Sequence, residues 1–173
     1  MWAGCPRGAA PHGRVVRFYD PGMEDWVPCV SPEGRFLLER PGWWEVEKEQ
    51  GALVLLAPDT GAGFRAQVVL AREPGILDVA LEQVTGDRLD QLSGALDDFQ
   101  LIDQAPAVLS SQPAQRVLIA CREHSLSVTI EQWWAITPSG VLSVSAVAPT
   151  MEYDAFADVF AHVAATLQVT ERD

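Results

Sequence analysis

Cys121 and His124 are the residues of this chain whose types and spacing come nearest to a metal-binding pair. Zinc prefers cysteine and histidine ligands, and a structural zinc site usually combines two such pairs. The other cysteines and histidines are scattered and form no second pair at comparable spacing: Cys5, Cys29, His12 and His162. We therefore expect no metal and no cofactor, with Cys121 ending a buried strand and His124 in the turn that follows.

Other catalytic motifs are also missing from the sequence. Gly61-Ala-Gly63 lacks the further glycine or lysine of a phosphate-binding loop. There is no Gly-x-Ser-x-Gly nucleophile elbow. The acid pair Asp97-Asp98 falls where a helix is expected to end, so capping and solvation explain it. We expect a protein that is not an enzyme, although catalytic groups assembled from distant residues remain an alternative.

Two tryptophan pairs, Trp43-Trp44 and Trp133-Trp134, are the stronger functional signal. Neighbouring residues on a strand point to opposite faces of its sheet. In a sheet covered on both faces all four rings would be core, whereas on an open face an exposed tryptophan anchors a protein interface. The candidate partner surface is therefore Trp44 or Trp133, beside Glu131 and Glu45.

A second, electrostatic candidate surface consists of Asp78, Glu82 and Asp90, on the polar side of an expected helix. The chain has 24 acidic and 12 basic residues, a net charge of −12. Such a charge repels nucleic acid and anionic membrane surfaces, so we expect the partner to be another protein. The negative charge either keeps the protein soluble or attracts a basic partner.

These side chains must be positioned by a layered α+β domain. Apolar runs and alternating patterns predict strands over residues 36–39, 43–47, 52–57, 64–72, 99–109, 114–122, 125–136 and 140–148. Helical spacing predicts one long helix over 76–96, and a kink or break near Thr85-Gly86 stays open as an alternative. A second helix is expected after Thr150, its N-cap, with an apolar stripe that runs from Tyr153 to Leu167.

Residues 1–33 are rich in proline and glycine, and we interpret them as an irregular leader that adds one edge strand, Arg14–Tyr19, and is anchored by Trp26. Residues 34–173 form the domain. No apolar run is long enough for a transmembrane helix, and the first residues have neither the basic start nor the apolar stretch of a secretory signal. We expect a cytoplasmic protein.

The order of several segments resembles the PsbP-like superfamily, in particular the DcrB-like and LpqN-like proteins of actinobacteria. The segments that carry the resemblance are Gly34–Trp43, Phe64–Glu73, Asp98–Asp103, Glu131–Trp134 and Tyr153–Ala157. The similarity spans residues 34–168. It implies an α/β/α sandwich with a central, mostly antiparallel sheet flanked by two main helices.

Members of this superfamily include photosystem accessory subunits, a Ran-binding transport factor, chaperones of secreted effectors and surface lipoproteins, which share protein binding rather than a reaction. The resemblance implies a non-catalytic protein-binding domain, such as an adapter, chaperone or accessory subunit. Two alternatives stay open. One is a secretion-effector chaperone that shields hydrophobic helices, and the other is a small-ligand carrier or enzyme with a pocket between sheet and helix.

Overall fold

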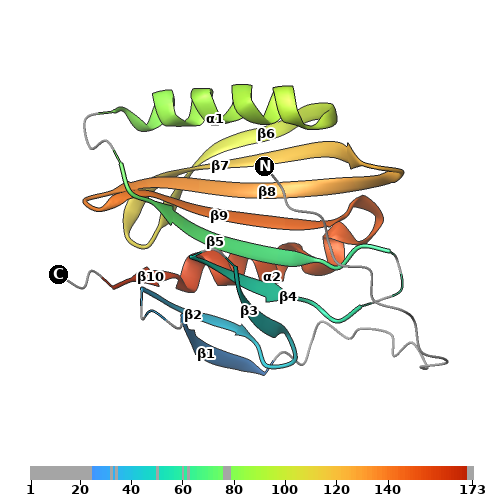
Figure 1. Ribbon diagram of the computed structural model, residues 1–173, viewed down its shortest axis with the longest axis horizontal. Helices are drawn as coiled ribbons and strands as arrows, with labels where there is room; N and C mark the ends of the chain where they lie inside the picture. Colours follow the sequence, from blue (N-terminus) through green and yellow to red (C-terminus); the bar gives the residue numbers. More distant parts are fainter. Residues whose placement is uncertain are drawn as a thin grey trace.

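The computed structural model describes residues 25–31, 33, 35–49, 51–59, 61, 63–75 and 79–170 (Figure 1). A seven-stranded sheet forms the centre, and its strands in spatial order are β3 (Glu45–Glu49), β4 (Ala52–Leu56), β5 (Gln67–Glu73), β9 (Gly140–Pro149), β8 (Leu126–Thr137), β7 (Gln112–Glu123) and β6 (Asp97–Leu109). A three-stranded sheet contains β1 (Trp26–Val30), β2 (Phe36–Pro41) and β10 (Gln168–Val169). All the pairings between these strands are antiparallel.

Two helices lie on opposite faces of the central sheet (Figure 1). Helix α1 (Leu81–Ala95) packs over β6, β7 and β8. Helix α2 (Tyr153–Thr166) follows the short 3-10 turn η1 (Thr150–Glu152) and covers the other face. The predicted α+β class and α/β/α sandwich are therefore confirmed. Neither helix is long and apolar enough to cross a membrane.

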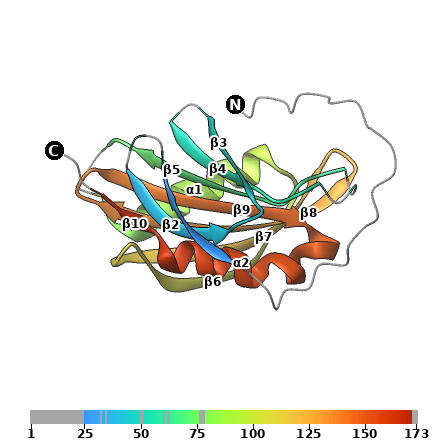
Figure 2. The same cartoon turned by 90° about the horizontal axis from the view of Figure 1, so that it is seen from below.

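The small sheet shares a layer with α2, and Figure 2 shows β2 beside this helix. The backbone N–H of Glu39 donates to Thr166 Oγ1 at 3.1 Å, and the side chain of Glu39 contacts His162. Strand β1 falls within residues 1–33, which we expected to be irregular, and the predicted strand Arg14–Tyr19 lies outside the described residues. Trp26 is partly buried and packs against the core, the position expected for an anchor.

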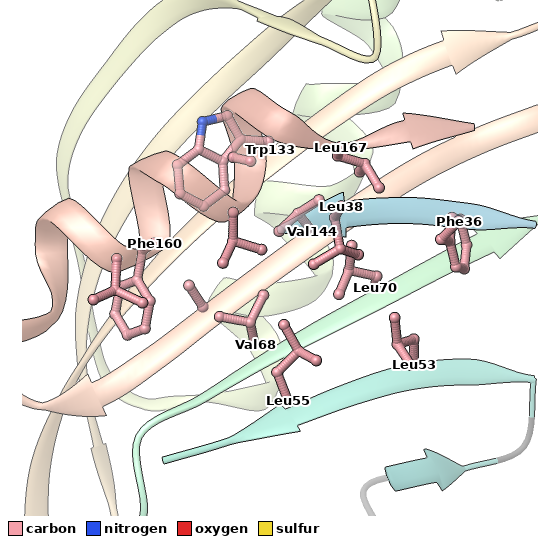
Figure 3. Packing of buried hydrophobic residues seen from close by; sticks show 14 of the residues in the cluster. Phe36, Leu38, Leu53, Leu55, Val68, Leu70, Trp133, Val144, Phe160 and Leu167 are labelled. Atoms are coloured by element: carbon pink, nitrogen blue, oxygen red, sulfur yellow. The ribbon is translucent and has the colours of Figure 1, made fainter. Parts of the chain in front are cut away.

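The alternating sequence of β8 divides its side chains between two cores. Trp133 packs in the core on the α2 side, whereas Trp134 packs in the core on the α1 side. This opposition follows from the two-residue period of a strand. Figure 3 shows the α2-side core, where Trp133 and Phe160 lie with Val144 and the side chains of β4 and β5.

Two local predictions were wrong. Strand β3 begins at Glu45, so Trp43-Trp44 lies in the turn after β2, where the backbone N–H of Trp44 donates to the carbonyl oxygen of Pro41 at 3.1 Å. Helix α1 forms one helix without a break at Thr85-Gly86, as the first of the two alternatives had it, and the Thr85 hydroxyl donates to the carbonyl of Leu81. Thr150 does not cap α2, because η1 precedes the helix and the Thr150 hydroxyl accepts a hydrogen bond from Thr129.

Candidate functional site

Glu131, one of the predicted surface residues, lies inside the protein. It is 3% exposed and stands in the middle of β8, on the sheet face that α2 covers. Arg116, on the neighbouring strand β7, donates from Nε to Glu131 Oε1. The Tyr153 hydroxyl, at the start of α2, donates to Glu131 Oε2 at 2.9 Å. Both carboxylate oxygens of Glu131 therefore have a donor from the protein.

This cluster extends to the sheet edge, where Arg116 Nη1 lies 3.0 Å from Asp103 Oδ2 on β6. Burial, then the charge of Glu131 and its hydrogen bond, raise the pKa of Tyr153 to about 12, and Arg116 offsets this only in part. Burial lowers the pKa of Arg116, but its bonds to Glu131 and Asp103 outweigh that effect and the net shift is upward. The phenol stays protonated and the guanidinium stays charged, so the cluster ties β6, β7, β8 and α2 together.

The placement of both candidate tryptophans on a partner surface was wrong. Trp44 is 2% exposed and Trp133 is 5% exposed. The Trp44 ring packs edge-on against Phe156 and Phe160 of α2, with centroids 6.1 and 6.4 Å away. Because α2 and β2 cover this face of the sheet, the space beside Trp133 is filled too. The exposed neighbour is Trp43, which is 38% exposed and packs edge-on against Trp44.

The predicted acidic residues lie on separate elements, one on the edge strand β3 and two on helix α1 over one face of the sheet. Glu45 is exposed on β3, and its Oε2 lies 3.0 Å from Arg65 Nη2. Glu82 and Asp90 are exposed on α1, across the sheet from the α2-side core, and Asp78 lies outside the described residues. The structure therefore does not bring the acidic helix residues near Trp44 or Trp133.

Cys121 and His124 lie in different environments, one buried and the other exposed. Cys121 is buried near the end of β7, and burial, followed by the nearby charge of Glu123, raises the pKa of its thiol. His124 is exposed in the turn between β7 and β8, with φ of 56°. Within the part of the chain that the structure describes, no three histidine, cysteine or acidic side chains are grouped closely enough to hold a metal ion.

Two of the hollows on the surface of the described residues can be compared with a ligand site. One, beside Ser31, Phe36 and Leu53, has a volume of about 10 Å³, which is space for a single water molecule. The other is an open depression near the turn between β6 and β7, lined by Ser110, Gln112, Thr137, Pro138 and Val169. Neither has the enclosed apolar walls that a small-ligand site between sheet and helix would have.

Strand β6 carries the exposed apolar residues that sequence analysis missed. Leu101 is 43% exposed, Ile102 is 56% exposed and Val108 is 69% exposed. Among the described strands, β6 lies at one edge of the central sheet and has only β7 beside it. The signal was available in the sequence, because Gln100, Asp103 and Gln104 interrupt this predicted strand with polar residues, a pattern typical of an edge strand.

The opposite edge strand, β3, has a different character. It is five residues long, and four of them are charged: Glu45, Glu47, Lys48 and Glu49. Short length and charge are devices that protect a sheet edge from other strands. The apolar surface of the two sheet edges is therefore concentrated on β6.

The fold is similar to that of several solved structures. LpqN of Mycobacterium tuberculosis, described as involved in cell envelope biogenesis, superimposes with a TM-score of 0.65 at 17% identity, over 85% of this chain and 91% of that one. The PsbP protein of Synechocystis (CyanoP) gives 0.61 at 12% identity, over 86% and 95%. The yeast Ran-binding protein Mog1p gives 0.63 at 9% identity, over 85% and 96%.

Neither the models of protein families nor the curated proteins match the sequence. At these identities, the structural likeness shows the fold alone. The chain thus has the PsbP-like fold that the sequence resemblance implied.

Proposed function

We propose that this chain is a non-catalytic, cytoplasmic protein-binding domain, an adapter or accessory subunit, and that strand β6 contributes to its partner surface. The observation that carries the proposal is the exposure of Leu101, Ile102 and Val108 on one edge strand. Apolar side chains gathered on a surface lose contact with water when a partner covers them, and such gatherings mark interaction sites.

Other exposed apolar residues among those described do not gather in this way. Val30 lies on β1, Val46 on β3, Trp43 in the turn after β2 and Met151 in η1, so no two of them share an element. Isolated apolar side chains are normal on protein surfaces. Strand β6 differs because it carries three of them, Leu101 and Ile102 in succession and Val108 six positions further along.

The arrangement of the buried cluster is structural rather than catalytic. Glu131 accepts hydrogen bonds from Arg116 and Tyr153 on both of its oxygens. A general base needs a carboxylate within hydrogen-bond reach of a substrate proton. Here the interactions of the carboxylate are directed to its own neighbours, which hold the sheet and α2 in place.

The structural neighbours support the proposal by analogy at the level of the fold. Mog1p, which has this fold, is a Ran-binding protein. The net charge of −12 favours a partner with a basic surface and disfavours nucleic acid and anionic lipid.

The test is affinity capture from a lysate of the source organism, with mass spectrometry of the retained proteins. The immobilised chain is compared with a triple variant, Leu101→Thr, Ile102→Thr and Val108→Thr, in which threonine keeps the strand propensity. Val46→Thr on β3 is the matched control. We expect a partner retained by the native chain and the control, and reduced at least about tenfold in the triple variant, the factor that 1.4 kcal/mol of binding energy supplies. Retention of no specific protein, or equal retention by the triple variant, would contradict the proposal.

A further inference from the structure

The turn between β6 and β7 determines which backbone N–H and C=O groups point outward from the free edge of β6. Ser110 and Ser111 connect β6 to β7 and have φ of 50° and 63°, both in the left-handed region. A two-residue turn of this type is closed by a hydrogen-bonded pair, here Leu109 and Gln112. Along an antiparallel ladder such pairs alternate with pairs whose N–H and C=O groups point away from each other.

The alternation fixes which backbone groups of β6 face outward. The register is regular from Gln104 to Leu109, so Ala105 and Ala107 bond to β7, as Leu109 does. The backbone groups of Gln104, Pro106 and Val108 point away from β7. Since β6 has no further described strand beside it, these carbonyls and the N–H groups of Gln104 and Val108 are available to another strand.

Pro106 occupies the position where a proline costs least. It has no N–H, but its nitrogen faces outward, so no bond to β7 is lost. One outward donor is removed and the donors on either side of it remain. The proline therefore shields the edge only in part, as does the register shift between Leu101 and Asp103.

The side chains of this edge differ on its two faces. Gln104 lies opposite Val117, which packs in the α1-side core, so Gln104, Pro106 and Val108 face the α1 side. Ala105 lies opposite Arg116, so Asp103, Ala105 and Ala107 face the α2 side. Asp103 bonds to Arg116 through Oδ2, and its side chain is still half exposed.

The charge of β6 decides between a second copy and another protein. The strand carries Asp97, Asp98 and Asp103 and no lysine or arginine. Asp98 and Asp103 pair with Arg122 and Arg116 of β7 but stay more than half exposed, and a second copy of β6 would bring them no further cation. A partner strand with cationic side chains would instead meet opposite charge.

We infer that β6 accepts an extended segment of a partner protein as an additional strand of the sheet, with apolar side chains on the α1 side and a lysine or arginine near Asp103 on the α2 side. This inference rests on the proposed function and specifies its partner. Main-chain hydrogen bonds to Gln104 and Val108 supply the affinity, and the alternation of apolar and basic side chains supplies the specificity.

Amide hydrogen exchange, followed residue by residue by NMR, tests the inference. The probe is a nine-residue peptide that alternates lysine and valine, and the control peptide alternates glutamate and valine. With saturating lysine peptide we expect exchange at the amides of Gln104 and Val108 to slow at least about tenfold, because a new strand protects them. The glutamate peptide should leave both unchanged. Unaltered exchange at these two amides, or protection elsewhere only, would overturn the inference.

Two variants at one position separate backbone pairing from side-chain contact. Val108→Pro removes the outward N–H, and its fold should be kept because Val108 makes no backbone bond to β7; Val108→Thr keeps the N–H. We expect the proline variant to weaken peptide binding at least tenfold more than the threonine variant does. Equal weakening would overturn strand pairing. If the proline variant does not fold, the Gln104 exchange measurement on the native chain decides.

Partner binding at β6 and strand addition at β6 give different results in two further measurements. If a captured partner is lost by the triple threonine variant but leaves the Gln104 and Val108 amides unprotected, strand addition fails while the proposed function stands. If sedimentation velocity shows a dimer that Val108→Pro dissociates, the edge belongs to a second copy and the inference is overturned.

Discussion

Trp26 of β1 stacks on His162 of α2, with ring centroids 3.7 Å apart and the ring planes 24° from parallel. Nε2 of the same histidine lies 2.8 Å from Glu39 Oε2 on β2. Two strands of the small sheet thus meet one side chain of the helix. This contact, with the bond from Glu39 N–H to Thr166, fixes the small sheet against the main domain.

The stacking should be measurable as a coupling between the two rings. In a double-mutant cycle of Trp26→Ala and His162→Ala, we expect a coupling of about 0.5–1.5 kcal/mol in the free energy of unfolding, as for other aromatic pairs. Urea denaturation gives the four values. A second cycle of Trp26→Ala with Arg122→Ala, on the far strand β7, should be additive. Equal coupling in the two cycles would refute a specific ring contact.

Removal of Arg116 should destabilise the protein far more than removal of Arg122. Arg116→Met leaves the carboxylate of Glu131 buried without its cation, and we expect a loss of about 3 kcal/mol. Arg122 pairs with Asp98 at 3.1 Å, but both side chains are more than half exposed. Arg122→Met should therefore cost less than about 1 kcal/mol. If chemical denaturation gave similar losses in the free energy of unfolding for the two variants, the buried cluster would not stabilise the fold more than an exposed ion pair does.

The hydroxyl of Tyr153 should influence stability in two ranges of pH. At pH 7, Tyr153→Phe leaves one oxygen of buried Glu131 without a donor, so we expect a loss of about 1–3 kcal/mol. The folded pKa of about 12 lies above the unfolded value of 10.0, so the folded state binds the phenol proton more tightly. Its contribution is fully present below pH 10 and is lost as the pH rises towards 12.

Comparing the native chain with Tyr153→Phe isolates the effect of the phenol's ionisation on stability. Between pH 10 and 12 the native chain should lose more stability than Tyr153→Phe, because only the native chain has this phenol to titrate. Denaturation midpoints measured at several pH values across this range provide the test. Parallel curves for the two proteins would mean that Tyr153 ionises equally well in both states.

Gly140 and Gly86 should respond in opposite directions to alanine. Gly140 opens β9 with φ of 129°, and a Cβ there would lie 2.0 Å from the carbonyl oxygen of Glu73. We expect Gly140→Ala to cost about 2–4 kcal/mol, since both the backbone and the contact become strained. Gly86 lies within α1 and a Cβ there meets open space. Gly86→Ala should stabilise by up to about 1 kcal/mol, and thermal denaturation would reveal the opposite shifts.

The sequence predicted the elements whose pattern is local. Strand β8 was expected over 125–136 and spans Leu126–Thr137, and Trp133 and Trp134 face opposite cores as the alternation predicted. The prediction that Trp43-Trp44 would begin a strand was wrong for a physical reason. Tryptophan favours strands, but here the Pro41-Gly42 turn extends further, and Arg40 Nη1 donates to the carbonyl oxygen of Trp44 at 2.7 Å.

The candidate site was harder to predict because it depends on the order of the strands. Polar residues in the sequence of β6 are typical of an edge strand, but Leu101 and Val108 could equally be core residues, and the pairing order is what places this strand at the edge. Glu131 shows the reverse case. Its charge suggested the surface, but Arg116 and Tyr153 come from 15 and 22 residues away and compensate its burial.

The small sheet joins β10, near the end of the domain, to β2, near its beginning, through Gln168–Leu37 and Val169–Phe36. On the ribosome, β1 and β2 can form their hairpin early, but that hairpin has no third strand and no helix to rest on until α2 and β10 have been synthesised. A nascent chain halted before Gln168 therefore leaves this corner unfinished, with Phe36 and Leu38 lacking part of their cover, and it is there that a chaperone or protease would find the incomplete product.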